Sequence, residues 1–279
     1  MREGELVSGK YNLIRCLGKG GMGEVWLACH TLLNKQVALK FLYPNLLSEC
    51  TYEEIKRLRH DLGYILFLNH PNIMQVRDFE SYQGAYFTVM DYVGSHNLHD
   101  LITRNFYTHE SFSEMNIISY VLQILSALSY AHKRGIIHCN LRPSKIFINE
   151  KDEIYLSGFI DAIFGDYYHL HNKLLVGAMP YTDPIMELSN ITQNASVVSD
   201  IYSLGIIMYE IATNKLPYWG PESLEIKLGH KYPKAPNTVN SQISPKLSSI
   251  IMKAIQLHPE DRFQSAKEMS KALEQCKHK

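Results

Sequence analysis

The sequence lacks the features of several large protein classes. Its longest apolar run, around 204–208, is far shorter than the roughly 20 residues that cross a bilayer. The N-terminal M-R-E-G-E-L contains no apolar signal core. We therefore expect no membrane-spanning segment and a soluble, cytoplasmic protein, which leaves open secretion by a route that needs no signal peptide.

The chain also has no net charge and no paired cysteine motif. The 28 Lys and Arg balance the 28 Asp and Glu, so the composition gives no electrostatic reason to expect a nucleic-acid partner. The cysteine number is odd and no C-x-x-C is present, which favours reduced thiols. The cysteines are Cys16, Cys29, Cys50, Cys139 and Cys276.

With 279 residues, the chain is long enough for one large domain or two lobes around a cleft.

A glycine-rich segment lies between two alternating apolar runs. The glycines of G-K-G-G-M-G, at 18–23, are followed by E-V-W-L-A, which is typical of a strand and not of a helix. The pattern therefore predicts a β-hairpin, whose glycines would let backbone N–H groups approach phosphates closely. An ordinary glycine-rich turn is the alternative.

Residues 138–160 read H-C-N-L-R-P-S-K-I-F-I-N-E-K-D-E-I-Y-L-S-G-F-I. Together with the glycine-rich hairpin and V-A-L-K at 37–40, this stretch resembles the protein kinase family, in particular bacterial Ser/Thr kinases. In that family a catalytic loop H-R-D-L-K-P-x-N and a later D-F-G supply the base and the magnesium ligands. The resemblance covers 9–276 and implies an α+β, bilobal fold. Residues 1–93 would form an N-lobe with a small antiparallel β-sheet and one main helix, and 94–279 a mainly helical C-lobe, together one kinase-like domain.

The positions that carry the family's chemistry are changed here. Asn140 stands at the position of the base, and Lys145 and Gly158 stand at those of the metal ligands. The amide of Asn140 cannot take up a proton at neutral pH. The Lys145 ammonium would repel a magnesium ion, since two positive charges about 4 Å apart repel by roughly 4 kcal/mol at a surface-like dielectric. Lys145 either replaces the metal and contacts phosphate or is a solvated lysine. Arg142 retains one positive charge, so we expect no intact catalytic residue and no bound metal.

The resemblance assigns a further set of residues to a nucleotide. Lys40 would contact the α- and β-phosphates, and Asp61, one methylene shorter than the family's Glu, would either pair with Lys40 or be solvated. Met90 would lie at the back of the adenine site, with the backbone of 91–93 facing the base and Phe147 narrowing the floor. The residues expected around the nucleotide are Leu17, Gly18, Gly20, Gly21, Gly23, Val25, Ala38, Lys40, Asp61, Met90, Asp91, Val93 and Phe147.

Other family positions predict supporting roles in the C-lobe. Asp200 is expected to hold the backbone of the catalytic loop, and Cys139 replaces an arginine and is expected to be a small buried residue. Arg262 in P-E-D-R-F would pair in the family with a glutamate that is Ile185 here, so it needs another partner or solvent.

These patterns predict a Ser/Thr kinase-like pseudokinase without phosphotransfer activity. It would act by binding a protein partner that the sequence does not identify, and it would bind ATP or ADP weakly and without Mg²⁺. One alternative is an unorthodox or weakly active ATP-dependent Ser/Thr kinase that uses Lys145, Arg142 and Asp161. The other is an interaction scaffold that binds no nucleotide, which Phe147 and Asp61 favour.

Overall fold

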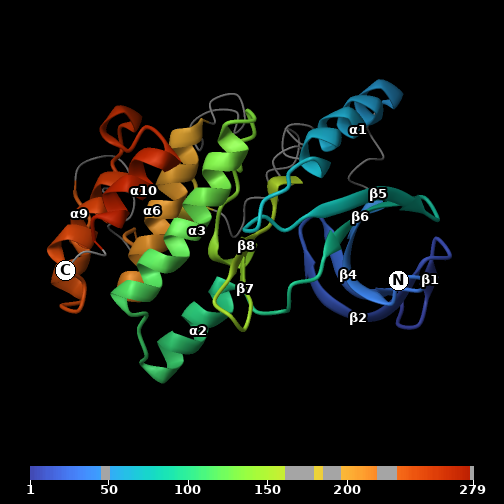
Figure 1. Ribbon diagram of the computed structural model, residues 1–279, viewed down its shortest axis with the longest axis horizontal. Helices are drawn as coiled ribbons and strands as arrows, with labels where there is room; N and C mark the ends of the chain where they lie inside the picture. The colour runs from blue at the N-terminus through green and yellow to red at the C-terminus, as the bar shows by residue number, and fades with distance from the viewer. Residues whose placement is uncertain (45–50, 161–178, 185–195, 219–230, 277–279) are drawn as a thin grey trace.

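The computed structural model describes the chain except for residues 45–50, 161–178, 185–195, 219–230 and 277–279. A curled β-sheet with helix α1 (Tyr52–Leu66) forms one end of the molecule, and a group of helices forms the other (Figure 1). The expected two-lobed α+β arrangement is therefore confirmed. Among the described residues, no helix is long and apolar enough to cross a membrane.

The N-lobe sheet has six antiparallel strands in the order β1-β2-β3-β4-β6-β5. The expected hairpin joins β2 to β3, with Gly20 paired to Gly23 across the turn. A Cβ at Gly23 would lie 1.8 Å from the carbonyl oxygen of Phe41, so only glycine allows β3 to approach β4 here. The strands are β1 (Leu6–Val7), β2 (Tyr11–Gly20), β3 (Gly23–His30), β4 (Lys35–Leu42), β5 (Val76–Tyr82) and β6 (Ala85–Asp91).

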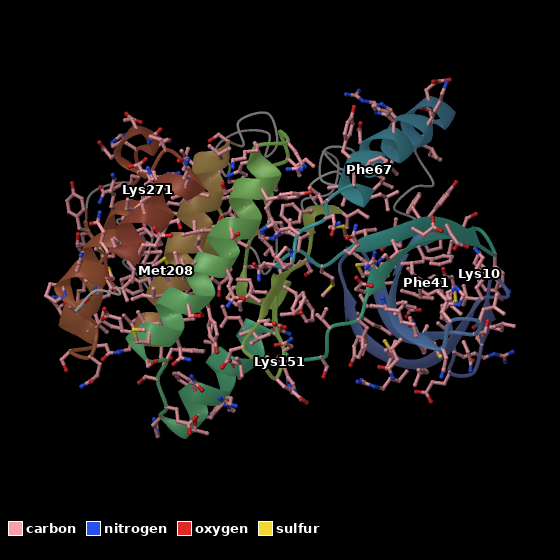
Figure 2. The ribbon with its side chains drawn as sticks, viewed as in Figure 1. Lys10, Phe41, Phe67, Lys151, Met208 and Lys271 are labelled. Atoms are coloured by element: carbon pink, nitrogen blue, oxygen red, sulfur yellow. The ribbon has the colours of Figure 1, made fainter. Side chains whose placement is uncertain are left out.

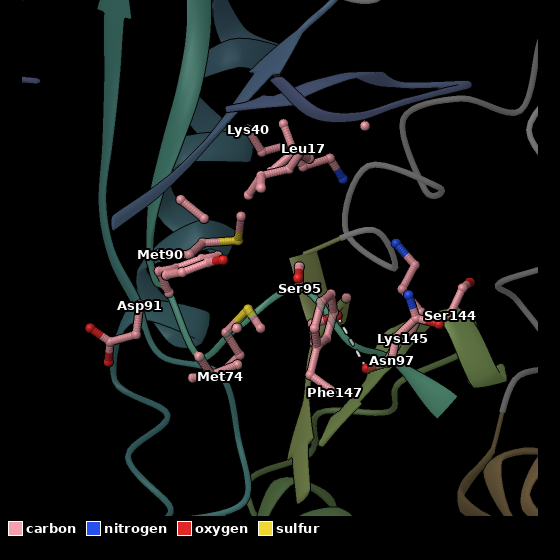
Figure 3. Close-up of a pocket in the computed structure, with 18 of the residues that line it drawn as sticks. Leu17, Lys40, Met74, Met90, Asp91, Ser95, Asn97, Ser144, Lys145 and Phe147 are labelled. Atoms are coloured by element: carbon pink, nitrogen blue, oxygen red, sulfur yellow. Dashed lines mark hydrogen bonds between the residues drawn. The ribbon is translucent and has the colours of Figure 1, made fainter. Parts of the chain in front are cut away.

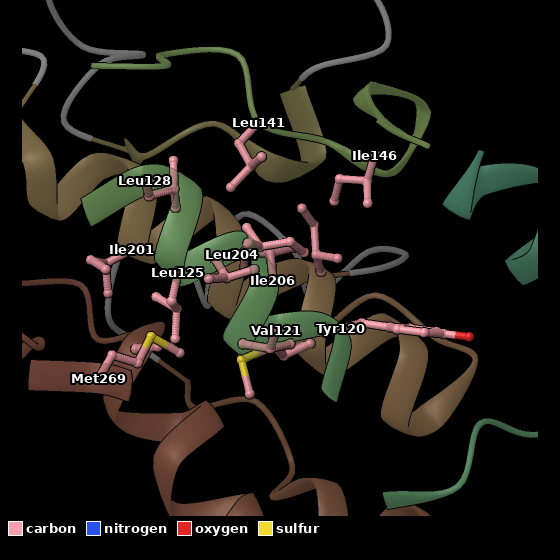
Figure 4. Close-up of a cluster of buried hydrophobic side chains, with 14 of the residues drawn as sticks. Tyr120, Val121, Leu125, Leu128, Leu141, Ile146, Ile201, Leu204, Ile206 and Met269 are labelled. Atoms are coloured by element: carbon pink, nitrogen blue, oxygen red, sulfur yellow. The ribbon is translucent and has the colours of Figure 1, made fainter. Parts of the chain in front are cut away.

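The C-lobe is built around helix α6 (Val197–Thr213), which is apolar on nearly every side and buried along most of its length. Helix α3 (Glu114–His132) packs beside it, and Figure 4 shows Leu125 and Leu128 of α3 facing the same core as Leu204 of α6. The other elements are α2 (Leu98–Thr108), β7 (Ile146–Ile148), β8 (Ile154–Leu156), α8 (Pro236–Val239), α9 (Pro245–Ala254) and α10 (Ala266–Glu274), with short 3-10 turns at Pro143–Lys145, Met179–Tyr181 and Pro259–Asp261.

Side chains sort by polarity between core and surface. Phe41 is 3% exposed inside the sheet and Met208 is fully buried in the helical lobe, whereas Lys10, Lys151 and Lys271 lie at the surface (Figure 2). Phe67, just after α1, is an exception at 83% exposed. Burial of the apolar side chains supplies the main driving force for the folding of each lobe.

Arg262 is buried in the C-lobe and has a partner that the sequence analysis did not identify. Its guanidinium donates to both carboxylate oxygens of Asp183, at 2.7 and 3.0 Å, and both side chains are at most 1% exposed. The same guanidinium donates to the backbone carbonyls of Gln256 (2.7 Å) and Leu257 (2.9 Å). Of the two expected possibilities, another partner or solvent, the structure shows the first. Ile185 lies outside the described residues.

Candidate functional site

A cavity of about 250 Å³ lies between the two lobes (Figure 3). Strands β2, β3 and β4 form its roof, the segment after β6 forms its side, and the turn before β7 with the segment after β8 forms its floor. This volume is slightly below the roughly 300–1,000 Å³ of typical small-molecule sites. The described lining consists of Leu17, Gly18, Val25, Ala38, Lys40, Met74, Met90, Asp91, Tyr92, Val93, Gly94, Ser95, Asn97, Ser144, Lys145, Phe147, Ser157, Gly158 and Ile160.

Most of the residues expected around a nucleotide meet at this cavity, although their role in binding stays a prediction. Four are absent from its described lining. Gly20, Gly21 and Gly23 form the tip of the β2–β3 hairpin, and the Asp61 carboxylate lies 3.4 Å from Nδ1 of its neighbour His60. The expected residues that do line the cavity are Leu17, Gly18, Val25, Ala38, Lys40, Met90, Asp91, Val93 and Phe147.

The sequence analysis missed several lining residues, among them Met74 and Asn97. Met74 lies in a connecting segment, and Asn97 is the N-cap of α2, a local role that gives no sign of the cavity. Asn97 reaches the cavity because its backbone pairs with that of Phe147, a contact between segments 50 residues apart. A local motif search carries no signal for such a contact.

The segment after β6 presents backbone groups to the cavity. The N–H of Asp91 donates to the carbonyl of Gln75 at 3.0 Å, so it is not available to a base. In the described part of the chain, no hydrogen bond uses the N–H of Val93, which lies two residues further on at the cavity wall. Of these two N–H groups, that of Val93 is therefore the one without a hydrogen bond in the described part of the chain.

The carboxylate of Asp91 is held by two cations. It accepts a hydrogen bond from Lys35 at 2.9 Å and two from Arg77 at 3.1 and 2.6 Å. Partial burial raises the pKa of Asp91, but the hydrogen bonds and charges of Arg77 and Lys35 outweigh it and hold that pKa below its usual value. Figure 3 shows this side chain directed away from the cavity.

Asp200 fixes the backbone of the loop that begins at His138. One carboxylate oxygen accepts from the N–H of Cys139 at 3.0 Å, and the other accepts from the N–H of His138 at 2.9 Å and contacts Nε2 of His132 at 2.8 Å. The expected role of Asp200 is thus confirmed. The expectation for Cys139 is wrong, because its thiol is only partly buried and its backbone adopts a left-handed φ of +58°.

The two positions of the family's metal ligands lie next to each other in space. Gly158 has a φ of +102°, and a Cβ there would lie 3.1 Å from Cδ of Lys145 and 3.4 Å from Cε1 of His138. Mg²⁺ requires oxygen ligands in near-octahedral geometry, and neither an ammonium group nor a glycine supplies one. Among the described residues, no cluster of three or more Asp, Glu, His or Cys could hold a metal. The described residues at these two positions therefore do not fit the metal that the resemblance implies.

Apolar packing continues directly after Gly158. Phe159 is 3% exposed and joins the C-lobe core, while Ile160 packs with Leu58 and Leu62 of α1. Met22, at the tip of the glycine-rich hairpin, packs against the same cluster. The segment after β8 is thereby attached to the N-lobe by apolar contacts. Asp161 lies outside the described residues.

Comparisons with known proteins agree on the fold and the family. The model of the protein kinase domain matches residues 11–275. Serine/threonine-protein kinase PrkC of Bacillus subtilis is 30% identical over 95% of this chain, and a probable serine/threonine-protein kinase of Clostridium perfringens, CPE1738, is 30% identical over 98%. The chain spans only 40% and 39% of the length of these relatives. The crystal structure of the PknI kinase domain of Mycobacterium tuberculosis superposes with a TM-score of 0.73 over 99% of both chains at 23% identity, so it shows the fold.

Proposed function

Because the chain belongs to the protein kinase family, we propose that it is a Ser/Thr kinase-like pseudokinase that acts by binding and does not transfer phosphate. The observation that carries this proposal is the arrangement of Lys145 and Gly158, in which the lysine stem lies 3.1 Å from the place of any Cβ at 158. A side chain at 158 would require this lysine to shift by a few tenths of an ångström. The two replaced metal-ligand positions thus lie in contact, which supports the proposal that metal binding is lost at both.

The expected loss of rate is large. A general base typically raises the reaction rate by a factor of about 10²–10⁴. Charge stabilisation by a metal lowers the activation free energy by several kcal/mol, and each 1.36 kcal/mol corresponds to a tenfold change in rate. Asn140 cannot act as that base, because its amide takes up no proton at neutral pH. Together these changes would lower phosphotransfer by roughly five orders of magnitude, even with the usual non-additivity.

The binding role has two parts. The cavity presents Lys40, the backbone of Val93 and an apolar wall that includes Val25 and Ala38 to a nucleotide, which supports weak binding of ATP or ADP. Phe147 on the floor favours weak over tight binding, because its ring lines a cavity that leaves only about 250 Å³ for a ligand. A protein partner, which these residues do not identify, would recognise whether this cleft holds a nucleotide.

The test is a phosphotransfer assay with radiolabelled ATP and Mg²⁺, followed on the chain itself and on a general protein substrate. We expect no transfer above the level of Lys40→Ala, with an active bacterial Ser/Thr kinase as positive control. The matched variant restores all three positions, as Asn140→Asp, Lys145→Asn and Gly158→Asp. Mg²⁺-dependent transfer by the wild-type chain that Lys40→Ala abolishes would overturn the proposal.

A further inference from the structure

Lys145 ends the turn before β7, and its main chain is fixed to the residue that precedes Gly158. Its carbonyl accepts hydrogen bonds from the N–H of Ser157 at 2.8 Å and from the Ser157 hydroxyl at 3.1 Å. Its side chain lines the cavity. Figure 3 shows it entering from the C-lobe side, while Lys40 enters from β4 on the N-lobe side. Two lysines from opposite lobes thus enter the same cavity.

Gly158 makes this position of the lysine possible. Its φ of +102° is one that residues with side chains rarely adopt, and a Cβ would contact Cδ of Lys145 at 3.1 Å. A side chain at 158 would require the lysine stem to shift by a few tenths of an ångström. The two replaced positions therefore form one arrangement, in which the missing side chain leaves room for a cation.

The charges of the described residues that line the cavity also favour an anionic ligand. Among the described residues that line it, Asp91 is the one acid, and its carboxylate is engaged by Lys35 and Arg77 and directed outward. The described lining therefore carries two lysines and no carboxylate directed into the cavity, while Asp161, which follows this lining in the sequence, lies outside the described residues. Lysines from both lobes favour an anionic ligand.

We propose that Lys145 binds the phosphates of a metal-free nucleoside di- or triphosphate in the place of Mg²⁺, so that Mg²⁺ weakens binding. This inference rests on the proposed function, since it needs a cleft that accepts a nucleotide. A lysine ammonium is a compact charge with three donors, suited to phosphate oxygens. A complexed Mg²⁺ cancels two of the ligand's negative charges and brings a second cation towards Lys145, so both effects lower affinity.

The test is calorimetric titration of the whole chain with ATP, ADP and adenosine, in EDTA and in Mg²⁺ at equal ionic strength. We expect ATP to bind about tenfold more tightly in EDTA, a difference of about 1.4 kcal/mol. Adenosine carries no phosphate, so its affinity should be the same in both buffers. Adenosine thus separates the effect on phosphates from any effect of Mg²⁺ on the protein.

Lys145→Met keeps most of the side-chain stem and removes the charge. We expect it to weaken metal-free ATP binding about tenfold, to reduce the effect of Mg²⁺ and to leave adenosine binding unchanged. Lys151→Met is the matched control, because Lys151 is exposed on the turn between β7 and β8 and its loss changes the net charge equally. Thermal unfolding without ligand reports whether each variant folds. Lys145→Asn combined with Gly158→Asp should make Mg²⁺ strengthen binding.

Three results would overturn the inference: tighter ATP binding with Mg²⁺, equal effects of Lys145→Met and Lys151→Met, or no ATP binding in either buffer. Each of these leaves the proposed loss of phosphotransfer standing, because that proposal is judged by transfer of labelled phosphate. The loss of phosphotransfer and the role of Lys145 are therefore tested separately, although absence of ATP binding would also remove the nucleotide-binding part of the proposed function.

Discussion

Replacing Asp183 by Asn should destabilise the C-lobe strongly. The substitution keeps the size of the side chain and removes the charge that faces Arg262, whose side chain is fully buried. Breaking a buried ion pair typically costs about 3–5 kcal/mol, since the remaining charge stays desolvated. The carbonyls of Gln256 and Leu257 still accept from the guanidinium, which favours the lower half of that range. Even so, the loss is a large share of a typical stability of about 5–15 kcal/mol.

The chain contains a matched surface pair for this experiment. Lys253 and Glu268 lie 3.2 Å apart with side chains 45% and 43% exposed, and exposed pairs contribute about 0–1 kcal/mol. Urea unfolding at pH 7, followed by circular dichroism, gives the free energy of unfolding of the wild type, of Asp183→Asn and of Glu268→Gln. Both variants convert a carboxylate to an amide. A loss in Asp183→Asn no greater than that in Glu268→Gln would refute the reasoning from burial.

Two further predictions concern packing and pH. Gly205→Ala should lower stability by about 1–3 kcal/mol, because the new Cβ would lie 2.8 Å from the Cβ of Ala254; Gly63→Ala, in an open position on α1, should instead raise stability slightly in the same urea titration. Asp91→Asn should be less stable than the wild type at pH 7, and the difference should shrink in acid as Asp91 becomes protonated. A carboxylate with a lowered pKa in the folded state stabilises the fold fully above its unfolded pKa of about 3.9 and loses that effect as the pH falls through the lower folded-state pKa. Urea midpoints of both proteins that fall in parallel would contradict this.

Contiguous motifs made much of the cleft predictable. The segment from His138 to Phe159 keeps fixed spacing, so the replacements at Asn140, Lys145 and Gly158 can be read by counting. The hairpin at 18–23 is likewise encoded locally, because alternating apolar residues and glycines determine strand and turn within one stretch. The separate structural roles of the individual glycines in this hairpin were not predictable. Gly23 serves the approach of β3 to β4 and does not line the cavity.

The sequence by itself determined the family, the two-lobed fold and the absence of the usual acid groups from the catalytic loop, since each depends on residue type and spacing within a short segment. Only the tertiary structure decided that Asp183 neutralises Arg262 over a separation of 79 residues, and that Gly158 leaves the space beside Lys145. Both are contacts between segments distant in sequence. Burial and hydrogen bonding through space select such partners, and no local pattern records them.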